Sequence, residues 1–564
     1  MNEILFLNSM SGIASGDLAT GVKALLHIGP SLIVVVFAFL SLIVVSLNQE
    51  KTNNGEKDAL RRSLNLQWLF ALAGLMVAVI WQLYLVGIGS GSTRLFGGVL
   101  VVDDTARVAL FMLLFVGFFA AIIGGARLRL KRANPTLNDP HVPGLLLLSL
   151  SGMNLAVLAS DLLALVLCLE TAGLPLVWLI GESSGKGRGS MRAYLNALFS
   201  ASLLLFGALF VQRVFGTTDY VILASNMEHH TEDAMQAIGV VFLCAGFSWK
   251  LAAMPFGLGW AGMSERAPSP VAILWDGCMK ITLVVAGLRL FVIVYNHPAV
   301  ALGPGGWTSL LATVAALTFI IGGTAVLWQQ RMAGLVGQLS LSVTGWIILG
   351  LVGLGLDGVG NRSATMGISY LVLAHGIGLV GILALCSWIE GEDGPQLGDK
   401  LGLSPSWKHL GIHHPFLAVA VCILAANLLG FPLTMGFWSR VALLESILSA
   451  EMSLSLVMIA VAGWAVSSLV LIRLIKAMWF PRRRDGISLL TPDKPAMDRI
   501  WDGLEEDDSS SFAGLARGDN DSDKVDTTSL GARLLRIVVF STVGLVVIGG
   551  LWPEPFLRFF SGNP

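Results

Sequence analysis

Charged residues are scarce in this chain of 564 residues. Lys, Arg, Asp and Glu together make up 13% of it, against about 25% in soluble domains, and 55% of the residues are hydrophobic. Apolar runs of about 20 residues, long enough to cross a bilayer, recur along the chain. The composition therefore excludes a soluble protein and predicts an integral membrane protein. The formal net charge of −1 argues against nucleic acid as a partner.

Cysteine is also scarce. The five cysteines all lie in apolar runs, and no two of them form a CxxC pair. Their spacing supports neither an iron–sulfur cluster nor a zinc site. Isolated cysteines in apolar runs behave as small hydrophobic residues. We therefore expect no metal and no redox centre in this chain.

The apolar runs predict an all-α integral membrane fold with about fourteen transmembrane helices. Two runs contain helix breakers, MPFGLG at 254–259 in the seventh helix and GFPLTMGF at 430–437 in the twelfth. Proline and glycine interrupt a helix and free backbone carbonyls, which membranes tolerate only against protein or a water-filled cavity. Helices 7 and 12 are therefore predicted to be broken inside the protein.

Basic residues cluster on alternate loops, for example at 51–62, 127–132 and 482–484. By the positive-inside rule, these loops face the cytoplasm and both termini face outward. The longest polar stretch, residues 481–530, runs from PRRRDG through EEDDSSS to GDNDSDKVD. Its composition predicts a soluble, disordered cytoplasmic loop, with docking to a partner as the alternative.

Five ionisable residues lie inside apolar runs or at their breaks: Glu170, Lys250, Lys280, His375 and Arg440. A charge at the centre of a membrane helix costs at least about 2.5–3.5 kcal/mol on insertion scales. Such residues are rare in membrane segments and mark pathways for ions or protons. Their recurrence along a helix bundle predicts a path for charge.

Glu170 and Lys250 are the first two of these residues. Glu170 lies roughly 14 Å along its helix from Asp161, which places it near mid-bilayer. Lys250 directly precedes the first break. A lysine whose carboxylate partner can approach and withdraw can take up and release a proton. The alternatives are a helix-end glutamate bonded to nearby backbone and a lysine that extends to the cytoplasmic interface.

The other three residues follow in later helices. Lys280 lies about 15 Å into its helix from Pro270, too deep to extend easily to the interface, and Asp276 shares its face four residues earlier. That pair is either functional or a structural ion pair. Arg440 stays protonated, so it supplies a fixed charge or satisfies the carbonyls of a broken helix. His375 is either a titrating group or a satisfied core histidine.

These residues lie in stretches that resemble the antiporter-like, proton-conducting membrane subunits of respiratory complex I (NADH:quinone oxidoreductase), closest to subunit N, called subunit 2 in mitochondria. Glu170, Lys250 and Lys280 stand at the family's glutamate and two lysines, and Arg440 stands where a lysine is usual. Four stretches carry the resemblance: LSLSGMNLAVLASDLLALVLCLETAGLPLVWLIG, RAYLNALFSASLLLFGALF, KLAAMPFGLGWAGMSERAPSPVAILWDGCMKITLVVAGLRLF and GFPLTMGFWSRVALLESIL.

The resemblance implies two inverted five-helix repeats, helices 4–8 and 9–13, each with one broken helix. It also implies a division of the chain into five parts. These are helices 1–3 in residues 1–143, the first repeat in 144–295, the second repeat in 296–480, the polar loop in 481–530 and a C-terminal transmembrane helix in 531–564.

A role in proton translocation follows as an expectation from the resemblance. Glu170 and Lys250 would form a switchable ion pair, and water would link Lys250 to Lys280, His375 and Arg440. Quinone reduction in partner subunits would drive the transfer of a proton. The chain would lie in a bacterial plasma membrane beside other membrane subunits of the same complex. NAD, FMN, iron–sulfur clusters and the quinone site would belong to those partners, and this chain would hold no cofactor.

The chain also departs from the family's pattern. The histidine, tryptophan and proline–aspartate turn that usually follow the first break are replaced by Gly257, Gly259, Ala261 and Gly262. In SLSVTGW at 340–346, Val343 stands where some relatives carry a histidine. These differences identify a divergent member.

Two rival hypotheses remain open. One is a subunit of a cation/proton antiporter or of a hydrogenase-type complex. The other is a scaffold homologue that has lost conduction, which the replaced turn residues and Arg440 favour. Retention of Glu170, Lys250 and Lys280 opposes the scaffold, because a buried charge without a function only costs stability.

Overall fold

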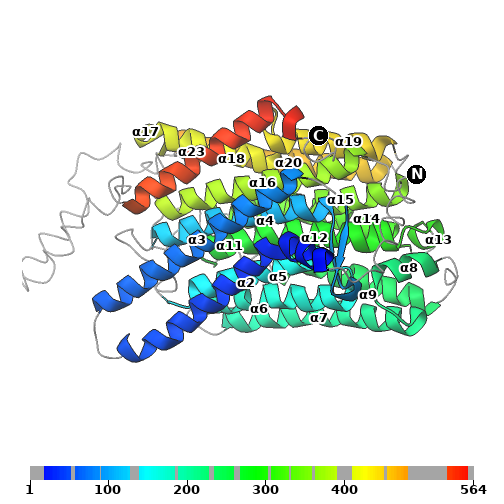
Figure 1. The fold of residues 1–564 in the computed structure, drawn as a ribbon. Helices are drawn as coiled ribbons and strands as arrows, with labels where there is room; N and C mark the ends of the chain where they lie inside the picture. Colours follow the sequence, from blue (N-terminus) through cyan, green and yellow to red (C-terminus); the bar gives the residue numbers. More distant parts are fainter. Residues whose placement is uncertain are drawn as a thin grey trace, which may run out of the picture.

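Residues 18–52, 57–88, 91–127, 139–183, 188–227, 234–259, 267–302, 306–328, 332–357, 362–389, 410–449, 454–480 and 530–556 are described by the structure, a computed structural model. Within these ranges the chain is almost entirely helical, and the helices form an elongated bundle (Figure 1). One two-stranded antiparallel sheet pairs β1 (Thr93–Leu95) with β2 (Leu100–Val102). The predicted all-α fold is confirmed. Residues 481–529 of the predicted polar loop lie outside the described residues.

The N-terminal part contributes three long helices that pack in sequence order: α2 (Leu18–Thr52), α3 (Lys57–Ile88) and α4 (Asp104–Arg127). Each of the first two buries a single stripe. On α2, Val34 and Ala38 are buried, whereas the neighbouring Phe39 and Leu40 are exposed. A helix with apolar residues on both its buried and its exposed faces is expected where the outer face meets lipid.

The next part contains helices that alternate in direction around a broken segment. After α9 the chain forms a short 3-10 turn, η4, and then a long helix assembled from α-helical and π-helical pieces. Isolated π-helical turns frequently occur at functional sites. The elements are α5 (Val142–Leu158), α6 (Leu162–Ser183), α7 (Arg188–Phe215), α8 (Tyr220–Asn226), α9 (Ala234–Lys250), η4 (Phe256–Gly259), α11 (Ser269–Ala272), η5 (Ile273–Cys278), α12 (Met279–Gly287) and η6 (Leu288–Val294).

The remaining helices include the second interrupted segment, where α18 ends at Leu429 and α19 begins at Met435. The last helix ends at Leu551, just before Pro553, which cannot donate to the helical ladder. The elements are α13 (Pro298–Ala301), α14 (Trp307–Trp328), α15 (Met332–Asp357), α16 (Arg362–Ile389), α17 (Leu410–His413), α18 (Pro415–Leu429), α19 (Met435–Ser449), α20 (Leu454–Trp479) and α23 (Leu530–Leu551).

Among the described residues, eleven helices are long and apolar enough to cross a membrane. Three shorter apolar helices, α5, α9 and α18, fall where the fourth span, the seventh span and the first half of the twelfth span are predicted. The chain is therefore a multi-pass integral membrane protein. The number of about fourteen spans and the two inverted repeats stay predictions.

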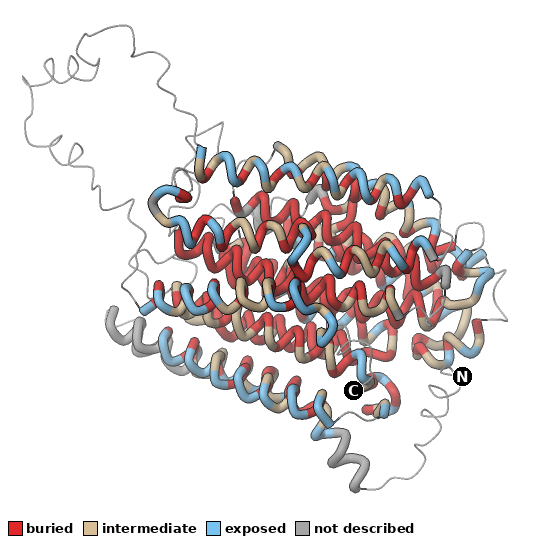
Figure 2. The backbone as a smooth tube through the Cα atoms, turned by 90° about the horizontal axis from the view of Figure 1, so that it is seen from above, coloured by how far each residue is buried: buried red, intermediate tan, exposed pale blue. Residues whose placement is uncertain are grey.

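The centre of the bundle is formed by the helix over residues 269–294 together with α15 and α16. Almost every residue of these three segments is buried, whereas α3 and α20 bury only one face. Figure 2 shows the buried backbone gathered in the middle and the exposed backbone on the outer helices. Lys280 and His375 therefore lie in the most enclosed part of the protein.

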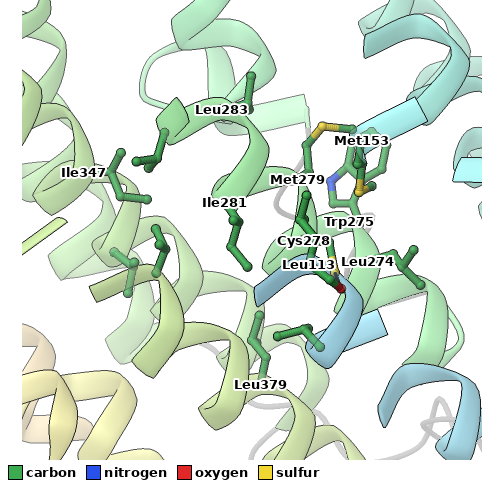
Figure 3. Packing of buried hydrophobic residues seen from close by; sticks show 14 of the residues in the cluster. Leu113, Met153, Leu274, Trp275, Cys278, Met279, Ile281, Leu283, Ile347 and Leu379 are labelled. Atoms are coloured by element: carbon green, nitrogen blue, oxygen red, sulfur yellow. Dashed lines mark hydrogen bonds between the residues drawn. The ribbon is translucent and has the colours of Figure 1, made fainter. Parts of the chain in front are cut away.

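Apolar side chains from four helices pack around the middle of the central segment (Figure 3). Leu113 of α4, Met153 of α5, Ile347 of α15 and Leu379 of α16 lie around residues 274–283. Polar groups in this segment are thus cut off from bulk solvent. Buried polar groups need hydrogen-bond partners within the protein. The buried Lys280 must therefore find its partners on neighbouring helices.

Candidate functional site

Glu170 and Lys250 meet in the first part of the bundle. Lys250 is the last residue of α9, and its Nζ lies 2.5 Å from Oε1 of Glu170 on α6. The side chain of Lys250 is 3% exposed and that of Glu170 is 19% exposed. Pro175, within α6, lacks the N–H that would otherwise bind the carbonyl of Thr171, beside Glu170. In this structure the lysine is buried against a carboxylate and does not extend to the surface.

The break that follows Lys250 is held by hydroxyls from two neighbouring helices. The chain leaves α9 through Leu251, and Ala252 adopts a left-handed conformation with φ of 59°. Thr344 Oγ1 on α15 donates to the Leu251 carbonyl at 3.2 Å. On α14, Thr318 Oγ1 accepts from the Met254 amide at 3.0 Å. These two threonines replace helical hydrogen bonds that the break removes.

The close packing of the turn explains why position 257 is a glycine and not the histidine expected from the resemblance. A Cβ atom there would overlap the carbonyl oxygen of Ala252, and the Gly257 amide donates to the Ala253 carbonyl at 2.6 Å. A histidine at this position therefore does not fit the turn as it is folded here. Ala261 and Gly262 lie outside the described residues.

Lys280 lies in α12, directly after the π-helical turn η5, and makes three polar contacts. Its Nζ donates to the Ser340 carbonyl at 2.6 Å and also to the Ser340 hydroxyl. Asp276 Oδ1, one turn earlier, is 3.9 Å from Nζ. The Ser340 hydroxyl oxygen in turn lies 3.1 Å from Nε2 of His375 on α16. Ser340 of α15 therefore connects Lys280 with His375.

Arg440 closes the second break. Its guanidinium donates to the carbonyls of Gly436 and Leu428 at 2.7 Å each, and it lies 5.9 Å from the ring centroid of Trp346 and 6.0 Å from that of Trp464. Contacts of this kind stabilise a buried cation. None of the described carboxylates forms an ion pair with Arg440.

Glycine and asparagine complete the second break. Gly430 ends α18 with φ of 77°, and a Cβ there would overlap Nη1 of Arg440. The side chain of Asn427 donates to the Ala374 carbonyl at 2.8 Å and accepts from the Gly436 amide at 3.0 Å. Asn427 thus joins the broken helix to the residue that precedes His375.

The structure brings the five predicted residues into one series of polar groups that crosses the bundle. Hydrogen bonds link Lys250 to Glu170, and Ser340 to both Lys280 and His375. The hydroxyl of Thr344 lies within hydrogen-bond distance of the Leu251 and Ser340 carbonyls. His375, Asn427 and Arg440 are connected through backbone groups, the Ala374 carbonyl and Gly436. The series, which we call the polar axis, comprises Glu170, Lys250, Leu251, Thr344, Ser340, Lys280, His375, Asn427 and Arg440.

Sequence reasoning missed the three members of the polar axis that contribute neutral polar side chains: Ser340, Thr344 and Asn427. A signal was present for each of them. Ser340 and Thr344 are spaced by four in an otherwise apolar helix, so they share one face. Asn427 is a polar residue three positions before the glycine that ends its helix. Hydroxyl and amide side chains are common in membrane helices, so their roles became visible only with their partners.

Within the described part of the chain, no cluster of three or more His, Cys, Asp or Glu residues could hold a metal ion. The described cysteines do not approach one another as disulfides. The side chains of the polar axis present amino, carboxyl, imidazole, guanidinium, amide and hydroxyl groups.

Comparisons with known proteins identify the family and the fold to which the chain is similar. Residues 159–466 match the family model described as "NADH:quinone oxidoreductase/Mrp antiporter, TM". A relative in Xanthomonas euvesicatoria pv. vesicatoria, NADH-quinone oxidoreductase subunit N, is 25% identical over 421 residues, which cover 74% of this chain and 82% of that protein.

Two solved structures share the fold. A chain of respiratory complex I from Thermus thermophilus is similar over 95% of this chain and 100% of that one, with a TM-score of 0.67 and 19% identity. A chain of the Mrp complex from Dietzia sp. DQ12-45-1b is similar over 95% and 96%, with a TM-score of 0.69 and 18% identity. At these identities, the two structures support the fold alone.

Proposed function

Because this chain belongs to the NADH:quinone oxidoreductase/Mrp antiporter family of membrane proteins, we propose that it is a proton-translocating membrane subunit of an NADH:quinone oxidoreductase in a bacterial plasma membrane. The name of the Xanthomonas relative supports the choice of complex. Quinone reduction takes place in partner subunits, which hold NAD, FMN, the iron–sulfur clusters and the quinone. This chain contributes the groups that move the proton.

The buried Glu170–Lys250 ion pair is the observation that carries this proposal. A carboxylate in contact stabilises the charged form of a lysine, and its withdrawal makes the lysine a better proton donor. Lys250 also lies at the end of a helix whose next turn leaves the regular helical hydrogen-bond pattern and is bound by two side-chain hydroxyls. A small shift of this turn therefore changes the distance between the two charges.

The proton then moves along the polar axis. When charge moves in a neighbouring subunit, Glu170 withdraws, and Lys250 releases its proton toward Lys280 through water. Lys280 and His375 pass the proton toward the second break. Arg440 acts there as a fixed positive charge that clamps the carbonyls of the broken helix. Reformation of the Glu170–Lys250 pair resets the cycle.

A cation/proton antiporter subunit is the second candidate, because the description of the matching family also names the Mrp antiporter. The two candidates share the polar axis and differ in their partners. Purification of the native complex discriminates between them. Copurification with quinone-reducing subunits supports the oxidoreductase, whereas copurification with other antiporter subunits supports the rival.

Lys250→Ala in the assembled complex tests the proposal. We expect the number of protons translocated per NADH oxidised to fall, because the variant removes the group that accepts and releases the proton. Proton uptake into inverted membrane vesicles and NADH–quinone activity are measured in the same preparation. Lys476→Ala is a matched control, because Lys476 is exposed at the end of α20. Unchanged proton translocation in Lys250→Ala, with Lys476→Ala also unchanged, would refute the proposal.

A further inference from the structure

We propose that the hydroxyl of Ser340 passes a proton directly between Lys280 and His375, so that Ser340 is a relay and more than a structural contact. The proposal rests on the proposed function, because a relay acts only where protons move. The proposal assigns the proton transfer from Lys280 to His375, in the centre of the bundle, to one side chain of α15. That step needs no intervening water molecule.

The contacts of Ser340 limit the direction of its hydroxyl. A serine hydroxyl has one hydrogen to donate and lone pairs that accept, whereas a charged lysine only donates. Lys280 Nζ donates to Ser340 Oγ, so Oγ accepts there. Two acceptors then compete for its single hydrogen, Nε2 of His375 at 3.1 Å and the Asp276 carboxylate, and the relay uses the state in which His375 accepts it. Neutral His375 then carries its own hydrogen on Nδ1 and presents Nε2 as an acceptor.

This arrangement allows a transfer in which every proton is accounted for. One N–H bond of Lys280 breaks as an O–H bond forms on Ser340. The original O–H bond of Ser340 breaks as an N–H bond forms at Nε2 of His375. Lys280 becomes a neutral amine, His375 becomes an imidazolium, and the serine is unchanged. The starting state is restored when His375 has released one proton and again carries its hydrogen on Nδ1, Lys280 has been reprotonated, and the Ser340 hydroxyl has rotated back toward Nε2.

The surroundings of the three groups favour a direct transfer. Ser340 is 1% exposed, His375 is 2% exposed and Lys280 is 4% exposed, and their helices form the enclosed centre of the bundle. Ile347 and Leu379 contribute to the apolar packing around this segment (Figure 3). Hydrogen bonds are stronger in such a medium than in water, and chains of them polarise one another.

The backbone of Ser340 holds the lysine in position for this step. The Ser340 carbonyl accepts from Lys280 Nζ at 2.6 Å, so the lysine keeps a partner when one of its protons leaves toward the hydroxyl. Asp276 Oδ1, at 3.9 Å from Nζ, balances the charge of Lys280 without occupying the N–H that faces Ser340. The carbonyl contact does not depend on the side chain at position 340, so substitution there removes the hydroxyl while the carbonyl contact is retained.

Three variants of the assembled complex separate a relay from a packing role. Ser340→Ala removes the hydroxyl, Ser340→Thr restores one, and Ser342→Ala makes the same chemical change two residues along α15. The hydroxyl of Ser342 forms no hydrogen bond with Lys280 or His375. Protons translocated per NADH oxidised are measured in inverted vesicles, together with NADH–quinone activity and the amount of assembled complex.

We expect Ser340→Ala to lower the number of protons translocated per NADH at least about tenfold, because a positioned proton-transfer group speeds its own step by about 10²–10⁴-fold. Ser340→Thr is expected to retain the wild-type ratio, as is Ser342→Ala. The relay is overturned if Ser340→Ala keeps the wild-type ratio, or if Ser340→Thr loses the ratio as completely as Ser340→Ala does in an assembled complex.

Two further comparisons keep the outcome decisive. If Ser340→Ala does not assemble, Ser340→Cys replaces it, because a thiol of similar size is a weaker hydrogen-bond donor and acceptor. A reduced ratio in Ser340→Cys then supports the relay, and a wild-type ratio overturns it. Loss of translocation in Lys250→Ala alone refutes the relay and leaves the proposed function standing, whereas full translocation in Lys250→Ala refutes the proposed function itself.

Discussion

Replacement of Arg440 by lysine is expected to loosen the break between α18 and α19, although lysine is usual there in similar subunits. The guanidinium donates from two nitrogens to two carbonyls, those of Gly436 and Leu428, at 2.7 Å each. A lysine ammonium is a single centre on a flexible stem, so we expect it to keep one of these bonds. A hydrogen bond to a charged group contributes about 1.5–3 kcal/mol to stability. Loss of one bond then raises the population of the opened break about 10- to 150-fold.

Hydrogen exchange of the purified complex, read by mass spectrometry, measures this opening. Peptides over residues 427–436 are expected to exchange faster in Arg440→Lys by that factor. Peptides over residues 250–259, which cover the other break, serve as the internal control in the same digest. If exchange over 427–436 equals that of the wild-type chain, Arg440 does not clamp the broken helix and the reasoning fails.

The remaining predictions concern the first break. Gly257→Ala is expected to lower the thermal unfolding temperature, because the added Cβ overlaps the Ala252 carbonyl oxygen. Gly87→Ala is the control and should leave this temperature unchanged, because nothing lies within 4 Å of a Cβ added there. Equal unfolding temperatures for the two variants would contradict the tight turn. Thr344→Val keeps the shape of the side chain but leaves the Leu251 carbonyl without its donor, at a cost of about 1–3 kcal/mol. Protons translocated per NADH should therefore fall while quinone reduction continues, and an unchanged ratio would remove Thr344 from the polar axis.

The membrane fold was predictable because it depends on composition along the chain. Long apolar runs leave a helical bundle as the one arrangement that satisfies every backbone group in lipid without a closed barrel. The proline and glycine residues at 254–259 and 430–437 interrupt a helix within a few residues of themselves, so the two breaks were predictable as well. The helices end at Lys250 and Leu429. The end of the last helix at Leu551, close to Pro553, was not predicted.

The ionisable residues were predictable for a related reason. A charged side chain stands out in an apolar run, so Glu170, Lys250 and Lys280 could be identified singly. The contact between Asp276 and Lys280 also followed from their spacing by four along one helix, although it is longer than a hydrogen bond at 3.9 Å. Spacing along one helix does not show which group on another helix lies closer to the lysine, and here that group is Ser340.

The sequence by itself therefore determined that this protein is a helical membrane bundle with breaks and buried charges at known positions, because apolar length and helix breakers act within a few turns. Only the tertiary structure decided which groups meet. The pairing of Glu170 with Lys250 across 80 positions was expected from the resemblance alone, and the contact of Lys280 with Ser340 across 60 positions was not expected at all. Such partners are selected by how whole helices pack, and an ordinary serine becomes a candidate relay only when packing places it between a lysine and a histidine.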